Sequence, residues 1–306
     1  METIYDVIII GCGPAGLAAG IYASRSRLRT LILEREMPGG ELMNINLVEN
    51  YPGFQDGVNG SDLGSSMMTQ ANKFGAEMQF VDVEKIIPGK NETILKTTMG
   101  EFHSKAVIIA SGSHSRKLGV PGEEELTNKG VFYCATCDGP RYVGKTVAVA
   151  GGGDSGVTEA LFMSSFVSKV VIIELMPQML ATKVLQERVA ANPKIEVRCG
   201  AKIEAIRGKE KMEFLELADV KTGQKSTLTA DGLLVRIGLI ANTAFLKGTL
   251  PMNSIGQVMV NDRMETEIPG IYAAGDVRHN SPMQIVTAVS DGATAAMRSL
   301  KYLGVC

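Results

Sequence analysis

The chain has 306 residues, of which 45% are hydrophobic and 21% are charged, and its formal net charge is -2. This length exceeds the size at which one hydrophobic core stops growing, so we expect two domains. The near-neutral charge gives no basic excess, so we expect no nucleic-acid partner. The apolar stretches are far shorter than the roughly 20 residues that span a bilayer, so we expect no membrane span.

The N-terminus has no pattern of a secretory signal. Met1-Glu2-Thr3 carries no basic region, and the apolar run that follows meets Gly11 too early. We therefore expect a cytoplasmic protein. In that reducing compartment five cysteines do not predict a disulfide framework, and a close Cys-x-x-Cys pair indicates redox or metal chemistry.

The first predicted element is a buried strand over Tyr5 to Ile10. It runs into Gly11-Cys12-Gly13-Pro14-Ala15-Gly16 and then into a helix predicted over Leu17 to Ser24. A second strand, Thr30 to Leu33, ends at Glu34. Strand, glycine turn, helix, strand and an acid about 20 residues on are typical of a dinucleotide-binding βαβ unit.

Each residue type in this pattern has a physical task. The first glycine makes the turn, the second lets a pyrophosphate approach the backbone, and the third packs the helix on the strand. The phosphates then lie at the positive N-terminus of the helix. The acid at the end of the second strand accepts hydrogen bonds from the hydroxyls of an adenosine ribose.

The same pattern recurs in the second half of the chain. A strand over Thr146 to Ala150 leads into Gly151-Gly152-Gly153-Asp154-Ser155-Gly156, a helix near Val157 to Phe166, and a strand over Val170 to Ile173 that ends at Glu174. The three glycines and the acid each lie 140 residues after their counterparts in the first copy. Two copies in full context predict two dinucleotide sites, one in each domain.

Two further strands end in glycine, over Ala106 to Gly112 and over Gly232 to Gly238. We interpret them as the ends of the two sheets, where the chain crosses between domains. The stretch Ile268 to Asp276 predicts another short strand, and Ile285 to Tyr302 predicts a helix. These last elements would return the chain to the first domain, so the fold class is α/β with two Rossmann-like, three-layer domains, the first discontinuous: 1–113 with 244–306, and 114–243.

The segment Cys134-Ala135-Thr136-Cys137-Asp138 lies just before the second nucleotide-binding unit. A two-residue spacer closes a small, reducible disulfide whose thiols have depressed pKa values. Asp138 is a candidate proton donor and acceptor for these thiols. Zinc would need a second pair of ligands, and the remaining cysteines and histidines are scattered without metal-ligand spacing: Cys12, Cys199, Cys306, His103, His114 and His279. We expect no metal and interpret the three single cysteines as packing or incidental residues.

The order of these motifs resembles the low-molecular-weight thioredoxin reductases along essentially the whole chain, and the Cys-Ala-Thr-Cys-Asp segment between two nucleotide folds is highly specific for them. The resemblance implies FAD in the first domain and a nicotinamide dinucleotide in the second, which carries the redox disulfide. It assigns FAD to Gly11, Gly13, Pro14, Ala15, Gly16, Glu34, Gly40, Glu41, Leu42, Asn50, Gly112, Asp276, Gln284 and Ile285. It assigns the nicotinamide dinucleotide to Gly151, Gly153, Asp154, Ser155 and Gly156, to which the ribose argument adds Glu174.

The resemblance also implies an activity, thioredoxin-disulfide reduction by a homodimer. Electrons would pass from a donor through FAD to the Cys134–Cys137 disulfide and then to thioredoxin. Cys137 would face the flavin, and Cys134 would attack the partner. Because one pose cannot serve all these encounters, we hypothesise a rotation of the second domain on the crossovers near Gly112 to Leu118 and Gly238 to Phe245.

The sequence departs from the family near both expected cofactors. Glu41 replaces a usual glutamine, and Met283-Gln284-Ile285 replaces arginine-glutamine-alanine. A carboxylate close to the flavin would disfavour its anionic reduced form. After the strand Val170 to Ile173 the family has a histidine and arginines that hold the 2'-phosphate of NADPH, whereas this chain has no cation between Glu174 and Lys183.

This last departure predicts the electron donor. A 2'-phosphate beside Glu174 would place like charges together, whereas the free ribose hydroxyl of NADH suits a carboxylate, so we expect NADH rather than NADPH. A first alternative is a thioredoxin reductase that uses reduced ferredoxin or a deazaflavin. A second is a peroxide-reducing flavoprotein, which usually needs an extra N-terminal thioredoxin-like domain, and we expect no room for one before Tyr5. A third, a dinucleotide-binding redox sensor, would not need both cysteines.

Overall fold

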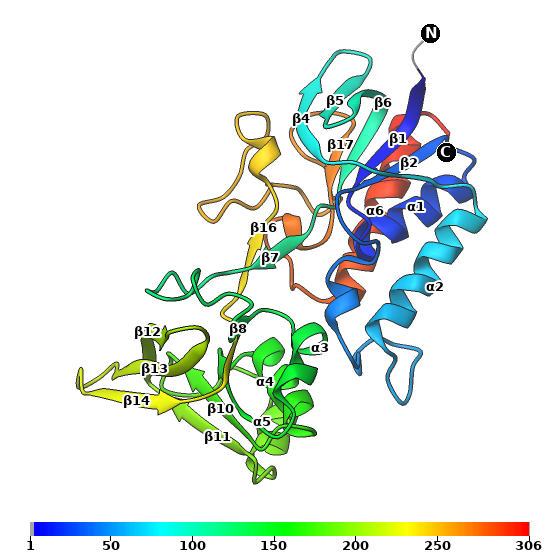
Figure 1. The fold of residues 1–306 in the computed structure, drawn as a ribbon. Coiled ribbons are helices and arrows are strands. Elements are labelled where there is room, and N and C mark those ends of the chain that lie inside the picture. Colours follow the sequence, from blue (N-terminus) through cyan, green and yellow to red (C-terminus); the bar gives the residue numbers. More distant parts are fainter. Residues whose placement is uncertain (1–2, 306) are drawn as a thin grey trace. The chain divides into compact units, whose positions relative to one another are not determined.

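The computed structural model describes residues 3–305, and the chain divides into two compact units (Figure 1). The first unit runs to His114 and resumes at Ile240, and the second is Ser115–Leu239. Two short strands, β7 (Ser113–Ser115) and β16 (Leu239–Ala241), lie at these two dividing points and pair with each other.

The first unit is built on a seven-stranded sheet in which β3, β2, β1, β6, β5 and β4 follow one another and β17 pairs with β6. β1, β2, β3, β6 and β17 run parallel, while β4, β5 and β6 form an antiparallel meander. The strands are β1 (Ile4–Ile10), β2 (Thr30–Glu34), β3 (Glu77–Phe80), β4 (Val83–Pro88), β5 (Thr93–Thr97), β6 (Gly100–Ile109) and β17 (Ile271–Ala273). The helices are α1 (Pro14–Arg25), α2 (Gly60–Lys73) and α6 (Ile285–Tyr302), with one-turn helices η1 (Gly40–Asn44), η3 (Ala244–Leu246) and η4 (Gly275–Val277).

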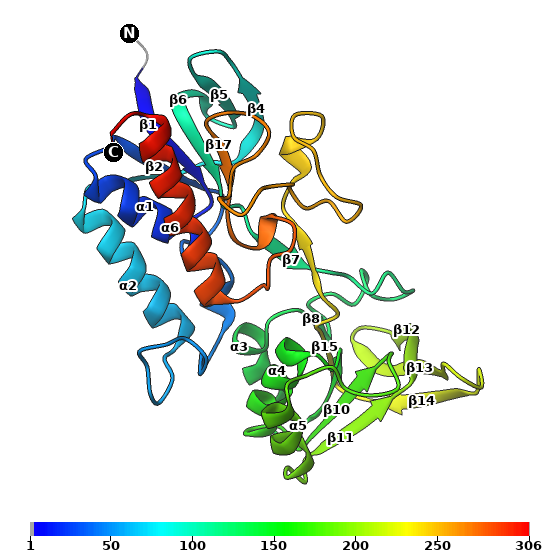
Figure 2. The same ribbon diagram turned by 180° about the vertical axis from the view of Figure 1, so that it is seen from behind.

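Alternate residues of the sheet in the first unit face two different cores. Val7 and Ile9 of β1 pack in one core with α1, α2 and α6, which lie on one side of the sheet in Figures 1 and 2. Ile8 and Ile10 face the other core, formed with β4, β5 and the chain after η3. Burial on both faces explains why the second half of β1, Val7 to Ile10, is an uninterrupted apolar run.

The second unit repeats this plan around a five-stranded parallel sheet with the order β11-β10-β9-β15-β8. Its strands are β8 (Val131–Phe132), β9 (Thr146–Ala150), β10 (Lys169–Glu174), β11 (Ile195–Cys199) and β15 (Gly232–Val235). One face packs on helices α3 (Ala135–Asp138), α4 (Asp154–Ser164) and α5 (Lys183–Ala190), with η2 (Gly139–Tyr142) between α3 and β9. The other face packs on an antiparallel sheet of β12 (Ala201–Gly208), β13 (Met212–Asp219) and β14 (Lys225–Thr229).

Both units are therefore three-layer α/β folds, and the predicted α/β class with two Rossmann-like domains is confirmed. Several details of the prediction were wrong. The helices predicted from Leu17 and Val157 begin earlier, at Pro14 and Asp154, and the strand predicted over Ile268 to Asp276 is only Ile271–Ala273. The strands before Gly112 and Gly238 are interior, because β6 and β15 each pair on both sides and are buried on both faces. The helix predicted to Phe166 ends at Ser164, since Ser165 and Phe166 close a tighter turn through bonds to Phe162 and Met163. Between residues 3 and 305, no helix combines the length and hydrophobicity that crossing a bilayer requires.

Candidate functional site

The two glycine turns have the same geometry. Gly11 and Gly151 have φ of 103° and 112°, in the left-handed region that favours glycine. A Cβ on Gly16 or Gly156 would overlap the carbonyl oxygen of Gly11 or Gly151, so only glycine lets the helix lie this close to the turn. The first and third glycines of each motif are therefore required by the fold itself.

The middle glycines, Gly13 and Gly153, are different. Both have extended backbone and cap the N-termini of α1 and α4, and a Cβ built on either meets nothing within 4 Å. The protein therefore does not need glycine there. A missing side chain that leaves open space in front of a helix N-terminus fits a site where pyrophosphate approaches the backbone.

The acids that end the second strands are held in the same way in both units. Glu34 accepts the N–H of Cys12 at 2.7 Å and that of Glu36 at 2.8 Å. Glu174 accepts the N–H of Gly152 at 2.6 Å and that of Met176 at 2.8 Å. Each carboxylate is thus fixed beside its glycine turn, and each oxygen keeps a second lone pair for another donor.

The other residues expected around FAD gather at the carboxyl ends of β1, β2, β6 and β17. The main-chain N–H of Gly39 donates to the oxygen of Cys12 at 2.8 Å, which brings Gly40, Glu41 and Leu42 of η1 beside the first turn. Asn50 donates its side-chain N–H to the side-chain oxygen of Gln284 at 3.0 Å, next to Ile285 at the start of α6. In open α/β sheets ligands bind at this edge, where the strand order switches, here between β1 and β6.

Asp276 lies in η4, after β17, and faces the segment that follows β6. Ser281 and Ser113 donate to its carboxylate at 3.3 Å and 3.5 Å, and Ser113 is the neighbour of Gly112. Burial raises the pKa of Asp276 above its usual value, and the charges of Glu41 and Asp291 add to this rise. The negative charge of Glu41 therefore reaches Asp276. Glu41 is one of the residues that depart from the family pattern.

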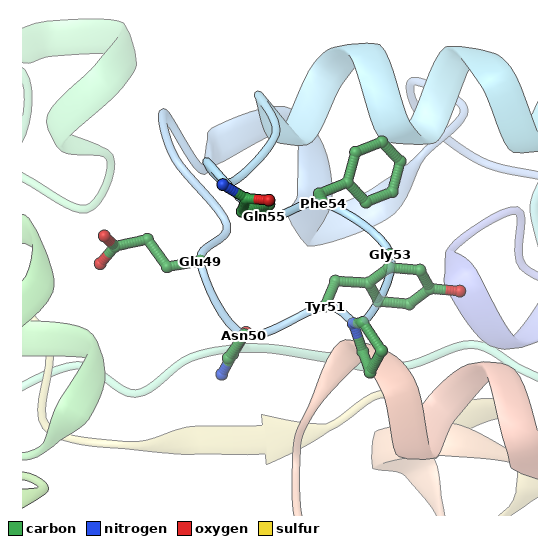
Figure 3. A pocket seen from close by; sticks show the side chains of 7 residues that line it. Glu49, Asn50, Tyr51, Gly53, Phe54 and Gln55 are labelled. Atoms are coloured by element: carbon green, nitrogen blue, oxygen red, sulfur yellow. The ribbon is translucent and has the colours of Figure 1, made fainter.

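A pocket of about 460 Å³ lies in the loop between η1 and α2. It is lined by Glu49, Asn50, Tyr51, Pro52, Gly53, Phe54 and Gln55 (Figure 3). The rings of Tyr51 and Phe54 lie 6.2 Å apart and tilted, on the same turn. The lining residues belong to the segment that is expected to wrap FAD, and Asn50 is one of them. The pocket therefore combines aromatic rings with the side-chain amides of Asn50 and Gln55.

In the second unit, Cys134 and Cys137 form a disulfide with their Cα atoms 5.4 Å apart. Cys134 caps the one-turn helix α3, and its sulfur accepts the N–H of Cys137 at 3.0 Å. Cys134 is half-buried and Cys137 is exposed. The Cys134 sulfur thus lies at the start of α3 with a backbone donor directed at it.

Asp138 follows this disulfide directly and forms an ion pair with Arg141 at 3.0 Å, four-fifths buried on the Asp138 side. The charge of Asp138, after burial, raises the pKa of Tyr142 above its usual value. Asp138 is thus mostly buried next to Cys137 in the chain, and its arginine partner is two-thirds exposed.

Several residues at these sites were missed by the sequence analysis. Ser113, Ser281 and the buried Asp291–Arg278 ion pair support Asp276 and Gly275. Glu159 and Arg236 lie behind α3. Ser113 is adjacent to a predicted glycine, and Ser281 and Arg278 lie within five residues of Asp276. Glu159 and Arg236 carried no signal, because packing brings them together from segments 77 residues apart.

The remaining cysteines lie apart from the disulfide. Burial first, and the charge of Glu34 second, raise the pKa of Cys12 to about 12, which makes it an unreactive packing residue. Cys199 is half-buried at the end of β11, and Cys306 lies outside the described residues. Among residues 3–305, no three histidine, cysteine or acidic side chains cluster in a way that could hold a metal ion.

Comparison with known proteins agrees with this geometry. The family described as pyridine nucleotide-disulphide oxidoreductase matches residues 5–292. A thioredoxin reductase of Bacillus subtilis (strain 168) is 42% identical over 303 residues, covering 99% of this chain and 96% of that protein. Crystal structures of thioredoxin reductases from Lactococcus lactis and T. acidophilum match with TM-scores of 0.96 and 0.95 and identities of 37% and 36%, each over at least 98% of both chains. The chain therefore belongs to the pyridine nucleotide-disulphide oxidoreductases and, within them, to the low-molecular-weight thioredoxin reductases.

Proposed function

We propose that this protein is a thioredoxin-disulfide reductase that carries electrons from NADH through FAD to the Cys134–Cys137 disulfide and then to thioredoxin. The observation that carries this proposal is the disulfide itself. It closes a one-turn helix in the same unit as a complete second dinucleotide turn. Relatives similar over nearly the whole chain are thioredoxin reductases by name.

Membership of the family implies a flavin and a nicotinamide cofactor. The first unit fits FAD, because the space in front of Gly13 is open, Glu34 is fixed beside it, and η1 and η4 bring Gly40, Glu41, Leu42 and Asp276 to the same edge. When bound, FAD supplies the two-electron carrier between the nicotinamide and the disulfide. The chain's task there is to bind and orient it.

The reduced cysteines would act by thiol–disulfide exchange. The Cys134 thiolate attacks one sulfur of the thioredoxin disulfide, forming a mixed disulfide and releasing the other sulfur as a thiolate. Cys137 then loses its proton, attacks the sulfur of Cys134 and restores the Cys134–Cys137 bond, which releases the second thioredoxin sulfur. Asp138 accepts the proton of Cys137 and passes it to the leaving thiolate.

The division of labour between the two cysteines is tested by trapping. A Cys137→Ser variant, reduced and mixed with a single-cysteine thioredoxin activated at its remaining thiol, should form a stable mixed disulfide through Cys134. A Cys134→Ser variant should form much less of it. The proposal rests on the hydrogen bond to the Cys134 sulfur, so trapping through Cys137 instead would reverse the two roles.

The environment of Glu174 supports NADH as the donor. Glu174 is 7% exposed and fixed by two backbone donors, so it cannot turn away from a 2'-phosphate. The main-chain N–H groups of Leu180 and Ala181 both donate to the oxygen of Gly152 at 3.0 Å, which folds the cation-free segment back over the glycine turn. Exposed Leu175, Met176 and Leu180 replace positive charge along this segment.

The donor experiment compares NADH, NADPH and reduced ferredoxin in anaerobic reduction of the flavin, followed by thioredoxin reduction at steady state. NADH should reduce the flavin faster than NADPH by at least about tenfold, since the repulsion between like charges held at close range exceeds about 1.4 kcal/mol. A Leu180→Arg variant should narrow this ratio, with Leu175→Gln as the uncharged control. Reduction by ferredoxin alone would instead favour a donor that is not a pyridine nucleotide, which the missing cations also allow.

We also propose a homodimer, which rests on the family resemblance alone. Light scattering on the purified holoenzyme gives the mass directly. A single-chain mass at micromolar concentration would rule this out.

A further inference from the structure

A buried ion pair lies directly behind the redox disulfide. Glu159, on α4, accepts the main-chain N–H of Ala135 at 3.2 Å with Oε2. Ala135 is the first residue of α3 and immediately follows Cys134. The carboxylate of Glu159 therefore holds the backbone of the turn that carries both cysteines.

Arg236 neutralises this carboxylate. It follows β15, and its Nη2 forms an ion pair with Oε1 of Glu159, with the two side chains only 8% and 15% exposed. Its Nη1 donates to the hydroxyl of Ser115 at 3.1 Å, while Nε finds no acceptor among residues 3–305. An arginine that is incompletely satisfied in a buried place depends on its acid partner.

We propose that Glu159 and Arg236 are paired positioning residues for the redox disulfide: Glu159 fixes the turn at Ala135, and Arg236 cancels the charge that Glu159 would otherwise present to the Cys134 thiolate. This inference deepens the proposed function and rests on it, because it assigns a role around the disulfide that the proposed function uses. Neither residue touches a reacting atom.

The charges around α3 make the proposal specific. Asp138 on α3 pairs with Arg141 of η2, Tyr142 of η2 is neutral with a raised pKa, and Glu159 of α4 pairs with Arg236. Asp138 and Glu159 thus each have their own cation, and beyond Tyr142 lie one further acid, Asp231, and one further cation, Lys145. The Asp138–Arg141 pair is partly exposed and therefore screened, but the Glu159–Arg236 pair is not.

Neutralising Glu159 and neutralising Arg236 in separate variants should shift the pKa of the Cys134 thiol in opposite directions. Glu159→Gln keeps an acceptor for Ala135 and leaves Arg236 unpaired, so a positive charge stabilises the Cys134 thiolate and the dithiol form. Arg236→Gln leaves Glu159 without its cation, so a negative charge disfavours the Cys134 thiolate and the dithiol form. A purely structural role would weaken the fold in both variants and would not reverse the sign of any shift.

The test uses the holoenzyme and two measurements that need no electron donor. The first is the pH dependence of Cys134 alkylation by iodoacetamide after reduction, followed by peptide mass spectrometry. The second is the equilibrium of the disulfide with a dithiothreitol redox buffer. Relative to the native chain, Glu159→Gln should lower the alkylation midpoint by about 1 pH unit, and Arg236→Gln should raise it by about as much. The redox equilibrium should shift about tenfold in the two opposite directions, or about 30 mV each way.

Three further variants complete the design. The double variant Glu159→Gln with Arg236→Gln should return close to the native midpoint, and Arg236→Lys, which keeps the charge, should stay near it even if the other variants fold poorly. Arg207→Gln is the control, because it breaks an exposed ion pair with Glu216 in the same unit and should change neither measurement. Shifts of the same sign, or no shift in either single variant, would overturn the proposal. Failure of the proposed function looks different: the native disulfide would titrate with dithiothreitol, yet no donor would lead to thioredoxin reduction.

Discussion

The carboxylates near the expected cofactor sites occupy two contrasting environments. Glu34 and Glu174 each accept two main-chain N–H groups, which fix the position of the carboxylate in advance of any ligand. Asp276 instead has two serine hydroxyls at 3.3 Å and 3.5 Å and is half-buried, and this burial raises its pKa. The chain therefore holds a carboxyl at Asp276 whose charged form is costly without a ligand.

Asp276→Asn should stabilise the protein without FAD and weaken FAD binding. A carboxyl whose pKa is raised in the folded state binds its proton more tightly there than in the unfolded chain. Its favourable contribution to the free energy of unfolding is therefore present below the unfolded pKa of about 3.9 and is lost as pH rises through the folded pKa. The gain of the variant over the native apoprotein should thus be larger at pH 7 than at pH 4.

Urea unfolding of both apoproteins at several pH values checks this, with exposed Asp262→Asn as the control. FAD affinity should fall roughly tenfold or more, as expected for a lost hydrogen bond to a charged group. A pH-independent difference in stability, or unchanged FAD affinity, would contradict the assignment of Asp276.

At the scale of elements, the βαβ unit is repeated, and we propose that each copy forms one dinucleotide site. The repeat extends to single hydrogen bonds: Gly11 donates to Leu33 at 2.8 Å, and Gly151 donates to Ile173 at 2.9 Å. Both helices begin at the middle glycine, with an open face before it. We therefore propose that the three glycines of one motif serve two purposes, folding for the first and third and ligand approach for the second.

Alanine substitutions should separate these purposes. Gly16→Ala pushes a methyl group into the carbonyl oxygen of Gly11 and should cost about 1–3 kcal/mol of stability. Gly13→Ala meets no protein atom within 4 Å and should leave the apoprotein as stable as the native one, yet reduce FAD retention sharply. Thermal unfolding of the apoproteins and flavin content of the purified variants are the measurements. Equal loss of stability in both variants would show that the middle glycine is needed for the fold instead.

At the scale of the whole molecule, each unit has its own cores. Two apolar clusters lie entirely in the first unit and two in the second, one on each face of each sheet. The two units are joined through the crossovers that contain β7 and β16. Each unit thus has the apolar burial that an independently folding domain requires.

Calorimetry should therefore resolve two unfolding transitions, each raised by its own ligand. A ligand at 100 times its Kd stabilises its unit by about 2.7 kcal/mol, or about 5 to 10 °C for a unit of this size. FAD should raise one transition and NADH the other, with NADPH as the control nucleotide. A single transition that both ligands raise together would show that the units unfold as one.

Much of the architecture follows from local pattern. The strands β1 and β9 and the helix α6 were predicted to within one residue, because an apolar run or a helical apolar spacing closes at a glycine or a cap. The disulfide was predicted as well, since two residues between cysteines leave few other geometries. The interior position of β6 and β15 could not be predicted, because pairing order depends on contacts between distant strands.

The sequence by itself determined the two glycine turns, the acids Glu34 and Glu174, the redox pair and the α/β class, because each depends on residues close together in the chain. Only the tertiary structure decided that Glu174 also accepts the N–H of Gly152, that burial and the charge of Glu41 raise the pKa of Asp276, and that Arg236 neutralises Glu159 behind Cys134. These are properties of packing, since Gly152, Glu41 and Arg236 come from segments far from their partners in the sequence. A charge acts through distance and burial, and no local pattern encodes either.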